Sequence, residues 1–261
     1  MPRLIATIPT TRTRLVAALS AIALVLAACS AAAGAPGPPS ASSGVMLSRT
    51  VPASIAELPL TDQHGHATDL AALHGRTVMI VPFLTLCQET CPFDTGNLVQ
   101  VQRALDRSGA GSKVVLMEVS VDPGRDTPAR LAAYARLSGA SFELVTESPA
   151  TLSAFDHYFA WYVQTVPEDD PPGIDWWTHQ PLTYDVDHSD GYTLIDPSGV
   201  ERFETGASPG YSGGLTPTLR HFLSPHGQSE VAHPAQPGWT PTMALASLGW
   251  MLHEHVAQAS S

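Results

Sequence analysis

Residues 78–92 read VMIVPFLTLCQETCP and join an apolar run, a short loop and the start of a helix. The first seven residues form a continuous apolar run of strand length, which is typical of a central strand covered on both faces. Pro92 indicates a first helical turn, because proline is tolerated there and its fixed backbone angle suits a helix. The stretch therefore predicts a buried strand that leads directly into a helix, with Cys87 and Cys91 at the junction.

The sequence on either side continues this alternation of strands and helices. A second apolar run of strand length covers residues 114–121, and residues 92–107 between the two runs are typical of a helix. We therefore expect an α/β domain with a central mixed sheet and helices on both faces. The other expected elements are a leading hairpin from 55–60 through a turn at 62–66, helices at 128–137, 149–159, 214–223 and 241–256, a strand at 142–145 and a hairpin at 192–204.

The charge of the chain argues against a nucleic-acid partner. The 261 residues include 24 acidic and 13 basic side chains, which give a formal net charge of −11. Nowhere do five or six basic residues cluster, as a protein that neutralises nucleic-acid phosphates would require. The 23 prolines and 20 glycines also exclude a long coiled coil and indicate many loops and turns.

The first 28 residues resemble the signal of an exported bacterial lipoprotein. Arg3, Arg12 and Arg14 precede an apolar run at 15–28, which is shorter than the about 20 residues that a membrane-spanning helix needs. The run leads into LAAC at 26–29, which resembles a lipobox, the motif whose cysteine is lipidated and becomes the mature N-terminus. We therefore expect Cys29 to be a lipid anchor at the cell membrane, facing the extracytoplasmic side. An ordinary cleaved signal is the alternative.

Residues 30–50 are rich in Ala, Gly, Pro and Ser, a composition that is typical of a flexible tether. Loss of the three signal arginines would change the formal charge from −11 to −14, so we expect the lipid, and not a basic patch, to hold the protein at the membrane. The predicted organisation is a lipoprotein signal at 1–28, a lipid anchor and linker at 29–50, a domain at 51–224, and a C-terminal extension with a helix at 225–261.

Cys87 and Cys91 are the cysteines that carry chemistry in the domain. Pro92 predicts that Cys91 caps the following helix, which would put both sulfurs at the positive end of the helix dipole and favour thiolates. A four-residue separation lets the two side chains reach one ion or each other. The pair therefore suits a soft metal ion or a reversible disulfide. An inert structural disulfide is the alternative, because exported proteins often pair their cysteines.

Three segments together resemble the Sco/SenC family. They are FLTLCQETCP at 83–92, VSVDPGRDTP at 119–128, and VDHSD at 186–190 followed by YTLIDPSG at 192–199. They occur in the family's order within residues 51–224. The resemblance implies a thioredoxin-like fold and one copper ion, Cu(I) or Cu(II), bound by the two cysteines of the C-x-x-x-C-P motif and a distant histidine. It thereby makes Cys87, Cys91 and His188 the expected copper ligands.

The resemblance also implies a function, because the family delivers copper to, or reduces the cysteines of, the binuclear copper centre of cytochrome c oxidase. The expected partner is the subunit that carries this centre, or another copper or thiol partner outside the membrane. A second function stays open, in which Cys87 and Cys91 are the redox pair of a thioredoxin-like thiol–disulfide oxidoreductase without a role in copper delivery. Asp122 and Asp126 are expected to be only a loop residue and a helix cap.

Overall fold

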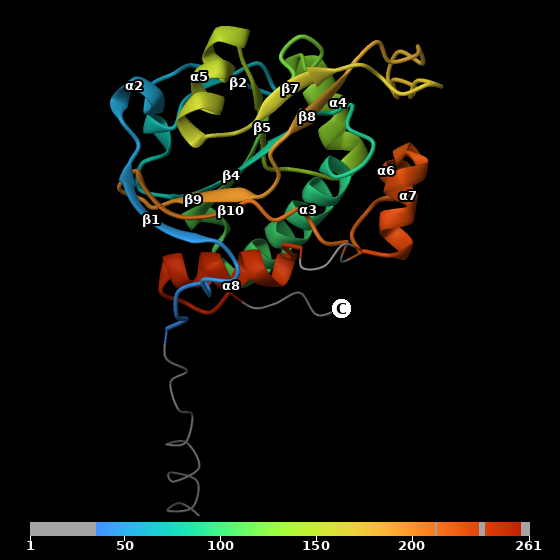
Figure 1. The fold of residues 1–261 in the computed structure, drawn as a ribbon. Helices are drawn as coiled ribbons and strands as arrows, with labels where there is room; N and C mark the ends of the chain where they lie inside the picture. The colour runs from blue at the N-terminus through green and yellow to red at the C-terminus, as the bar shows by residue number, and fades with distance from the viewer. Residues whose placement is uncertain (1–34, 212, 235–237, 257–261) are drawn as a thin grey trace, which may run out of the picture. The chain divides into compact units, whose positions relative to one another are not determined.

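The apolar run that precedes the cysteines lies in the middle of a mixed sheet. The computed structural model describes residues 35–211, 213–234 and 238–256, and the strand order of its main sheet is β1-β10-β9-β4-β5-β6-β2-β3 (Figure 1). β4, β5 and β6 are parallel, and β9 pairs antiparallel with β4. The strands are β1 (Val45–Thr50), β2 (Leu60–Asp62), β3 (Ala67–Thr68), β4 (Thr77–Phe83), β5 (Val114–Ser120), β6 (Glu143–Thr146), β9 (Tyr192–Ile195) and β10 (Val200–Thr205), with β7 (Val163–Val166) and β8 (Asp185–His188) in a separate two-stranded ribbon.

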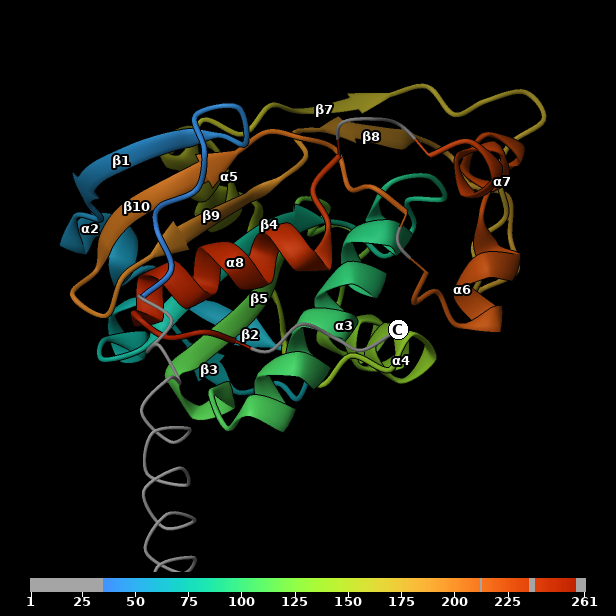
Figure 2. The ribbon, with the colours of Figure 1, turned by 90° about the horizontal axis from the view of Figure 1, so that it is seen from below.

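Helices cover both faces of the main sheet, which explains the unbroken apolar run of β4 (Figure 2). Met79 and Val81 belong to a core layer shared with α3 and α8, whereas Val78 and Ile80 belong to a layer shared with α5. Successive strand residues point to opposite faces, so a strand covered on both sides buries every side chain. The helices are α2 (Ala53–Ala56), α3 (Cys91–Ser108), α4 (Pro128–Ser138), α5 (Pro149–Phe159), α6 (Pro217–Phe222), α7 (Pro225–Ala232) and α8 (Pro241–Leu252), with 3₁₀ turns η2 (Ala71–Leu73) and η3 (Gly111–Lys113).

The C-terminal helix α8 is part of the domain core. Leu245 and Leu248 are buried in the same layer as residues of α3 and β4. Thr240 caps the helix by accepting a hydrogen bond from the Met243 N–H, and Trp239 just before it is fully buried. The extension that the sequence placed after residue 224 therefore packs its last helix onto the sheet through leucines at helical spacing, Leu245, Leu248 and Leu252.

The predicted α/β fold, with a central mixed sheet between helices, is confirmed. The apolar runs form β4 and β5, and the helices predicted at 92–107 and 149–159 are α3 and α5. The hairpin predicted at 192–204 is the β9–β10 pair. These elements have strong local signals, namely long apolar runs, a proline in the first helical turn and the Asp-Pro-Ser-Gly turn.

Several predicted boundaries were wrong. Residues 45–50, assigned to the linker, form β1, which pairs antiparallel with β10. Residues 53–56 form the helix α2 where a strand was expected from residue 55, although the predicted turn at 62–66 does join β2 to β3. The last helix ends at Leu252 and not near residue 256, and α7 was not predicted at all. β1 depends on a pairing partner distant in sequence, which composition does not reveal, whereas α8 ends where His253 adopts a left-handed conformation.

Two predicted helix caps were also wrong. Thr90 is the residue before α3, which begins at Cys91 itself, so Cys91 is a helical residue and not the cap. Thr127 caps α4 by accepting from the Arg130 N–H, and Asp126 points elsewhere. The expected signal, the lipid anchor at Cys29 and the first part of the linker lie outside the described residues. Within the part of the chain that is described, no helix has both the length and the apolar character to span a bilayer.

We expect Leu248→Ala to lower the free energy of unfolding by about 2–5 kcal/mol, because it removes a fully buried side chain and leaves a cavity between α8 and α3. Urea denaturation of the full chain measures the change. Ala246→Gln on the exposed face of α8 is the control and should change the free energy by less than about 0.5 kcal/mol. Equal effects of both variants would show that α8 is not part of the cooperative core.

Candidate metal centre

The fold brings Cys87, Cys91 and His188 together from three different segments. Cys87 lies in the loop after β4, Cys91 is the first residue of α3, and His188 is the last residue of β8. Cys91 Sγ lies 3.2 Å from His188 Nε2, although the residues are 97 positions apart. The Cys91 backbone N–H donates a hydrogen bond to Cys87 Sγ over 3.4 Å. The predicted ligand residues therefore form one cluster at the junction of β4 and α3.

Both cysteines are free thiols, so the structure shows no disulfide between them. Within the described segments no group of three or more His, Cys, Asp and Glu side chains is already arranged to hold a metal ion. The two thiols and the imidazole are in hydrogen-bond contact. Their side chains would have to adjust to converge on one ion. Contact of this kind brings the donor atoms close but does not by itself form a coordination sphere.

Backbone geometry holds His188 in the orientation that this contact needs. Its Nδ1 lies 2.8 Å from the Ser189 carbonyl oxygen, to which it donates a hydrogen bond. With Nδ1 directed at that carbonyl oxygen, Nε2 faces Cys91. β8 is held in turn by β7, where Val163 pairs with His188.

The two thiols differ in their protonation. Hydrogen bonding from Cys91, reinforced by His188, holds the pKa of the Cys87 thiol well below its ordinary value, although burial opposes this effect. Burial raises the pKa of the Cys91 thiol well above its ordinary value, and the neighbouring Cys87 raises it further. Burial alone would lower the pKa of His188, but the hydrogen bond and negative charge of Cys87 outweigh it and raise that pKa. Cys87 is therefore the more readily ionised thiol of the pair.

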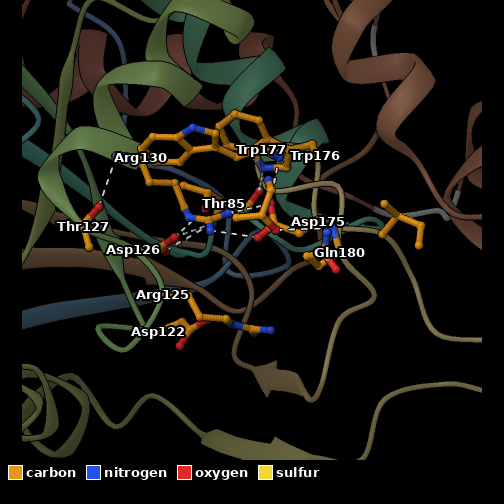
Figure 3. Close-up of polar contacts among 12 residues, drawn as sticks. Thr85, Asp122, Arg125, Asp126, Thr127, Arg130, Asp175, Trp176, Trp177 and Gln180 are labelled. Carbon is orange, nitrogen blue, oxygen red and sulfur yellow. Dashed lines mark hydrogen bonds and ion pairs between the residues drawn. The ribbon is translucent and has the colours of Figure 1, made fainter.

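A buried carboxylate ties the cysteine loop to the end of β5. Asp126 accepts hydrogen bonds from the Thr85 backbone N–H, from the Thr85 hydroxyl and, over 2.7 Å, from the Ser120 hydroxyl (Figure 3). Burial raises the pKa of Asp126 to about 6, against the effect of these three donors. Thr85 lies two residues before Cys87, so Asp126 fixes the point from which the cysteine loop departs.

A second set of contacts connects the same region to the segment that leads into β8. Arg125 forms an ion pair with Asp122 and donates a hydrogen bond to the Tyr184 carbonyl oxygen over 2.7 Å. Its guanidinium lies 3.7 Å from the centre of the Tyr184 ring, and the Tyr184 hydroxyl donates to Asp122 over 2.9 Å. These contacts hold the chain four residues before His188. The segment 119–128 therefore positions both halves of the candidate site.

A tryptophan-containing loop is anchored next to the cysteine loop. Arg130 of α4 forms two hydrogen bonds of 2.9 and 2.8 Å to Asp175, and both residues are buried (Figure 3). Trp176 donates its indole N–H to the Thr85 carbonyl oxygen over 2.8 Å and stacks against Trp177. The loop between β7 and β8 is thus fixed to the same residue, Thr85, that Asp126 holds.

The cluster opens into a cavity of about 910 Å³ with an acidic lining. The cavity lies between the cysteine loop, the loop from β7 to β8, and Ser224 with Pro225. Its lining includes seven carboxylates and, among the described residues, neither lysine nor arginine. The carboxylates belong to Glu89, Glu168, Asp169, Asp170, Asp185, Asp187 and Asp190.

Further buried carboxylates lie behind the thiols. Asp94 of α3 accepts a hydrogen bond from the Trp239 indole over 2.9 Å, and Glu118 of β5 accepts one from Thr95 over 2.7 Å. Each has a second carboxylate oxygen without a partner. Burial raises the pKa of Asp94 well above its ordinary value and that of Glu118 to about 8. Burial therefore favours the protonated form of both groups.

The sequence analysis found the three candidate ligands but missed the residues that position them. Asp126 was expected to be a helix cap and Asp122 a loop residue, and Arg125 and Tyr184 were not singled out. A usable signal was present, because Asp122, Arg125 and Asp126 directly follow an apolar strand. Loops at the carboxyl ends of parallel strands are where sites form in α/β sheets.

Comparison with known proteins gives consistent matches. The model of the SCO1/SenC family matches residues 49–208. The mitochondrial protein SCO2 homolog of Bos taurus is 27% identical over 144 residues, which are 55% of this chain and 50% of the relative. An SCO2-like protein of Rickettsia conorii is 24% identical over 156 residues, which are 59% of this chain and 70% of the relative.

The chain spans about half the length of the mammalian relatives it matches. Among solved structures, Bradyrhizobium japonicum ScoI with copper bound is similar to 68% of this chain and 97% of its own, with 26% identity and a TM-score of 0.47.

We expect iodoacetamide near neutral pH to modify Cys87 at least about tenfold faster than Cys91, because Cys87 is partly exposed and has a lowered pKa whereas Cys91 is fully buried and has a raised pKa. Mass mapping of peptides from the full chain separates the two positions. In the Cys87→Ser variant, modification of Cys91 should remain as slow as in the parent. Equal rates for both cysteines would contradict the assignment of the thiolate to Cys87.

The free energy of unfolding should fall as pH rises from about 5 to about 8. The pKa of Glu118 is raised from 4.5 to about 8, so over this range the unfolded chain releases a proton that the folded chain retains. Raised pKa values at Asp94 and Asp126 act with the same sign.

Glu118→Gln should reduce this fall by an amount on the order of a few kcal/mol, because the amide has no proton to release. Urea denaturation at both pH values measures it. The exposed Glu57→Gln is the matched control and should leave the fall unchanged. A Glu118→Gln variant with the parent's full pH dependence would show that Glu118 does not contribute.

Proposed function

This chain belongs to the SCO1/SenC family, and on that premise we propose that it binds one copper ion through Cys87, Cys91 and His188. The observation that carries the proposal is the contact of 3.2 Å between Cys91 Sγ and His188 Nε2, beside the Cys87 sulfur that accepts the Cys91 N–H. Two thiols and one imidazole from three separate segments meet, and Cys87 and His188 of this cluster line one cavity.

The donor set fits copper. Thiolates are soft ligands that suit Cu(I), and an imidazole adds a ligand that also suits Cu(II), so the three groups together can hold either state. Cys87 has a lowered pKa and ionises first, whereas Cys91 has a raised pKa and would release its proton on binding. The hydrogen bond from His188 Nδ1 to Ser189 presents Nε2 as the metal-binding nitrogen.

We propose that the copper is cargo, delivered to the binuclear copper centre of cytochrome c oxidase during its assembly. The open cavity beside Cys87 supports exchange with another protein, since a resident ion needs no such access. The lipobox-like sequence at 26–29 supports a lipid anchor at Cys29, which would hold the domain on the extracytoplasmic side of the membrane.

A second candidate function is thiol–disulfide exchange, and the asymmetry of the thiols favours it. Cys87 is the exposed member with the lowered pKa, as the attacking thiol of a redox pair requires, and Cys91 is buried behind it. In this reaction the Cys87 thiolate attacks a disulfide of the partner and releases one thiolate. Cys91 then attacks the mixed disulfide, which leaves a Cys87–Cys91 disulfide and a reduced partner that has gained two electrons.

Copper retention by the reduced full chain tests the main proposal. After loading with Cu(I) or Cu(II) and desalting, we expect about one copper per chain in the parent and none at this site in the Cys87→Ser, Cys91→Ser double variant. His188→Ala should weaken affinity by at least about tenfold, because it removes one of three ligands. His64→Ala, which removes an exposed histidine from the β2–β3 turn, is the matched control and should retain the parent's copper.

The same variants separate the two functions. Exchange with a small aromatic disulfide should survive in His188→Ala if the imidazole serves only copper. A parent that retains no copper in either oxidation state, yet forms a reversible Cys87–Cys91 disulfide, would overturn the copper proposal in favour of thiol exchange.

A further inference from the structure

Large apolar side chains are exposed at few places on the described surface, and three of the five line the acidic cavity or the cavity next to it. Five large hydrophobic side chains are exposed, of which Val45 and Met46 lie on the edge strand β1. The other three are Tyr162, Ile174 and Trp177, with exposed fractions of 54%, 49% and 40%. Tyr162 lines the acidic cavity, and the other two line a second cavity next to it. Clustered exposed apolar groups are typical of an interaction site, whereas scattered ones are not.

The second cavity is an apolar groove of about 870 Å³ between α4, α6 and the loop from β7 to β8. Its apolar lining residues include Leu137, Ile174, Trp176, Trp177 and Phe222, and no carboxylate is among its described lining residues. Gln88, Ser224 and Pro225 line both this groove and the cavity at the thiols. The groove is thus continuous with the entrance to Cys87.

Contacts within the protein hold the walls of the groove, so the groove is preformed. The buried Arg130–Asp175 ion pair and the Trp176 hydrogen bond to Thr85 hold one wall (Figure 3). On the other side, the Ser224 N–H donates to the Gln88 carbonyl oxygen over 2.9 Å, which joins the end of α6 to the cysteine loop. A preformed groove lowers the entropy cost of binding.

Charge is divided between the two cavities. Seven carboxylates line the cavity at the thiols, whereas the groove is apolar with Arg136 as its one charged lining residue among those described. An apolar side chain is therefore favoured in the groove, and a cationic side chain is favoured at the cavity. A single segment with both features would lie across the shared residues Gln88, Ser224 and Pro225.

We infer that the groove and the acidic cavity form one docking surface for a protein partner, whose bound segment carries apolar side chains for the groove and lysine or arginine for the cavity. The identity of this partner as the protein that exchanges copper with Cys87 and Cys91 rests on the proposed function. The docking itself depends only on apolar burial and charge. Docking at the groove would hold the partner's own ligands beside the thiols and make transfer effectively intramolecular.

Short fluorescein-labelled peptides test the surface by fluorescence anisotropy with the full chain. The probe peptide carries a Leu-Phe pair near one end and two lysines near the other. In one comparison peptide the lysines are replaced by glutamates, and in a second the Leu-Phe pair is replaced by two serines. We expect the probe to bind at least about tenfold more tightly than either comparison peptide.

Two substitutions in the protein locate the binding. Ile174→Glu should weaken the affinity for the probe peptide by about tenfold, because it places a charge in the groove. Met46→Glu, which changes an equally exposed apolar residue on β1, should have no effect. Asp169→Lys should weaken binding of the probe peptide and improve binding of the glutamate peptide. The exposed Glu57→Lys should change neither affinity.

The outcomes separate docking from copper binding. Copper retention in Ile174→Glu should equal that of the parent, since Ile174 lines the groove and is not a proposed ligand. Probe binding by a parent that holds no copper would leave the docking surface in place and remove only the proposed function. The docking surface would be overturned if Ile174→Glu bound the probe peptide as tightly as the parent does. It would also be overturned if gel filtration showed that the parent self-associates and so covers the groove.

Discussion

The carboxylate of Asp126 is the point on which the geometry of the candidate site depends. It accepts from Thr85 at the start of the cysteine loop and from Ser120 at the end of β5, so the ends of two parallel strands are held to one buried group. Trp176 bonds to the carbonyl of the same Thr85 and brings in the loop between β7 and β8. A buried carboxylate is costly unless donors surround it, and that cost makes the arrangement of the three segments specific.

Asp122 and Asp126 are four residues apart but act on different halves of the site. Asp126 fixes the loop that carries the cysteines, whereas Asp122, through Arg125 and Tyr184, fixes the segment that leads to His188. The thiols and the imidazole come from elements with no direct strand pairing between them, since β8 belongs to the separate ribbon and β4 to the main sheet. The loop after β5 therefore supplies a connection that the sheet itself does not.

The elements with strong local signals could be predicted from the sequence, and the elements that depend on distant partners could not. The apolar runs of β4 and β5 and the proline at the start of α3 specify their own structure. β1 was assigned to a linker because its six residues give little sign of a strand until β10 is placed beside them. Asp126 precedes Thr127 and Pro128 and so matches a cap locally, yet its side chain turns to Thr85, 41 residues away. His188 was found only through the resemblance, because no local pattern reveals a contact across 97 residues.

The lowered pKa of Cys87 is caused by groups inside the cluster and not by the lining of the acidic cavity. Seven carboxylates around the entrance disfavour a further negative charge, so the lowered pKa of Cys87 must come from nearer groups. These groups are Cys91 and His188, which donate hydrogen bonds or positive charge at short range. The carboxylates act at longer range and have a different effect, because they repel anionic small molecules and attract cations. The same lining thus leaves the thiolate available to a metal cation or a basic partner segment while it discourages anionic oxidants from reaching Cys87.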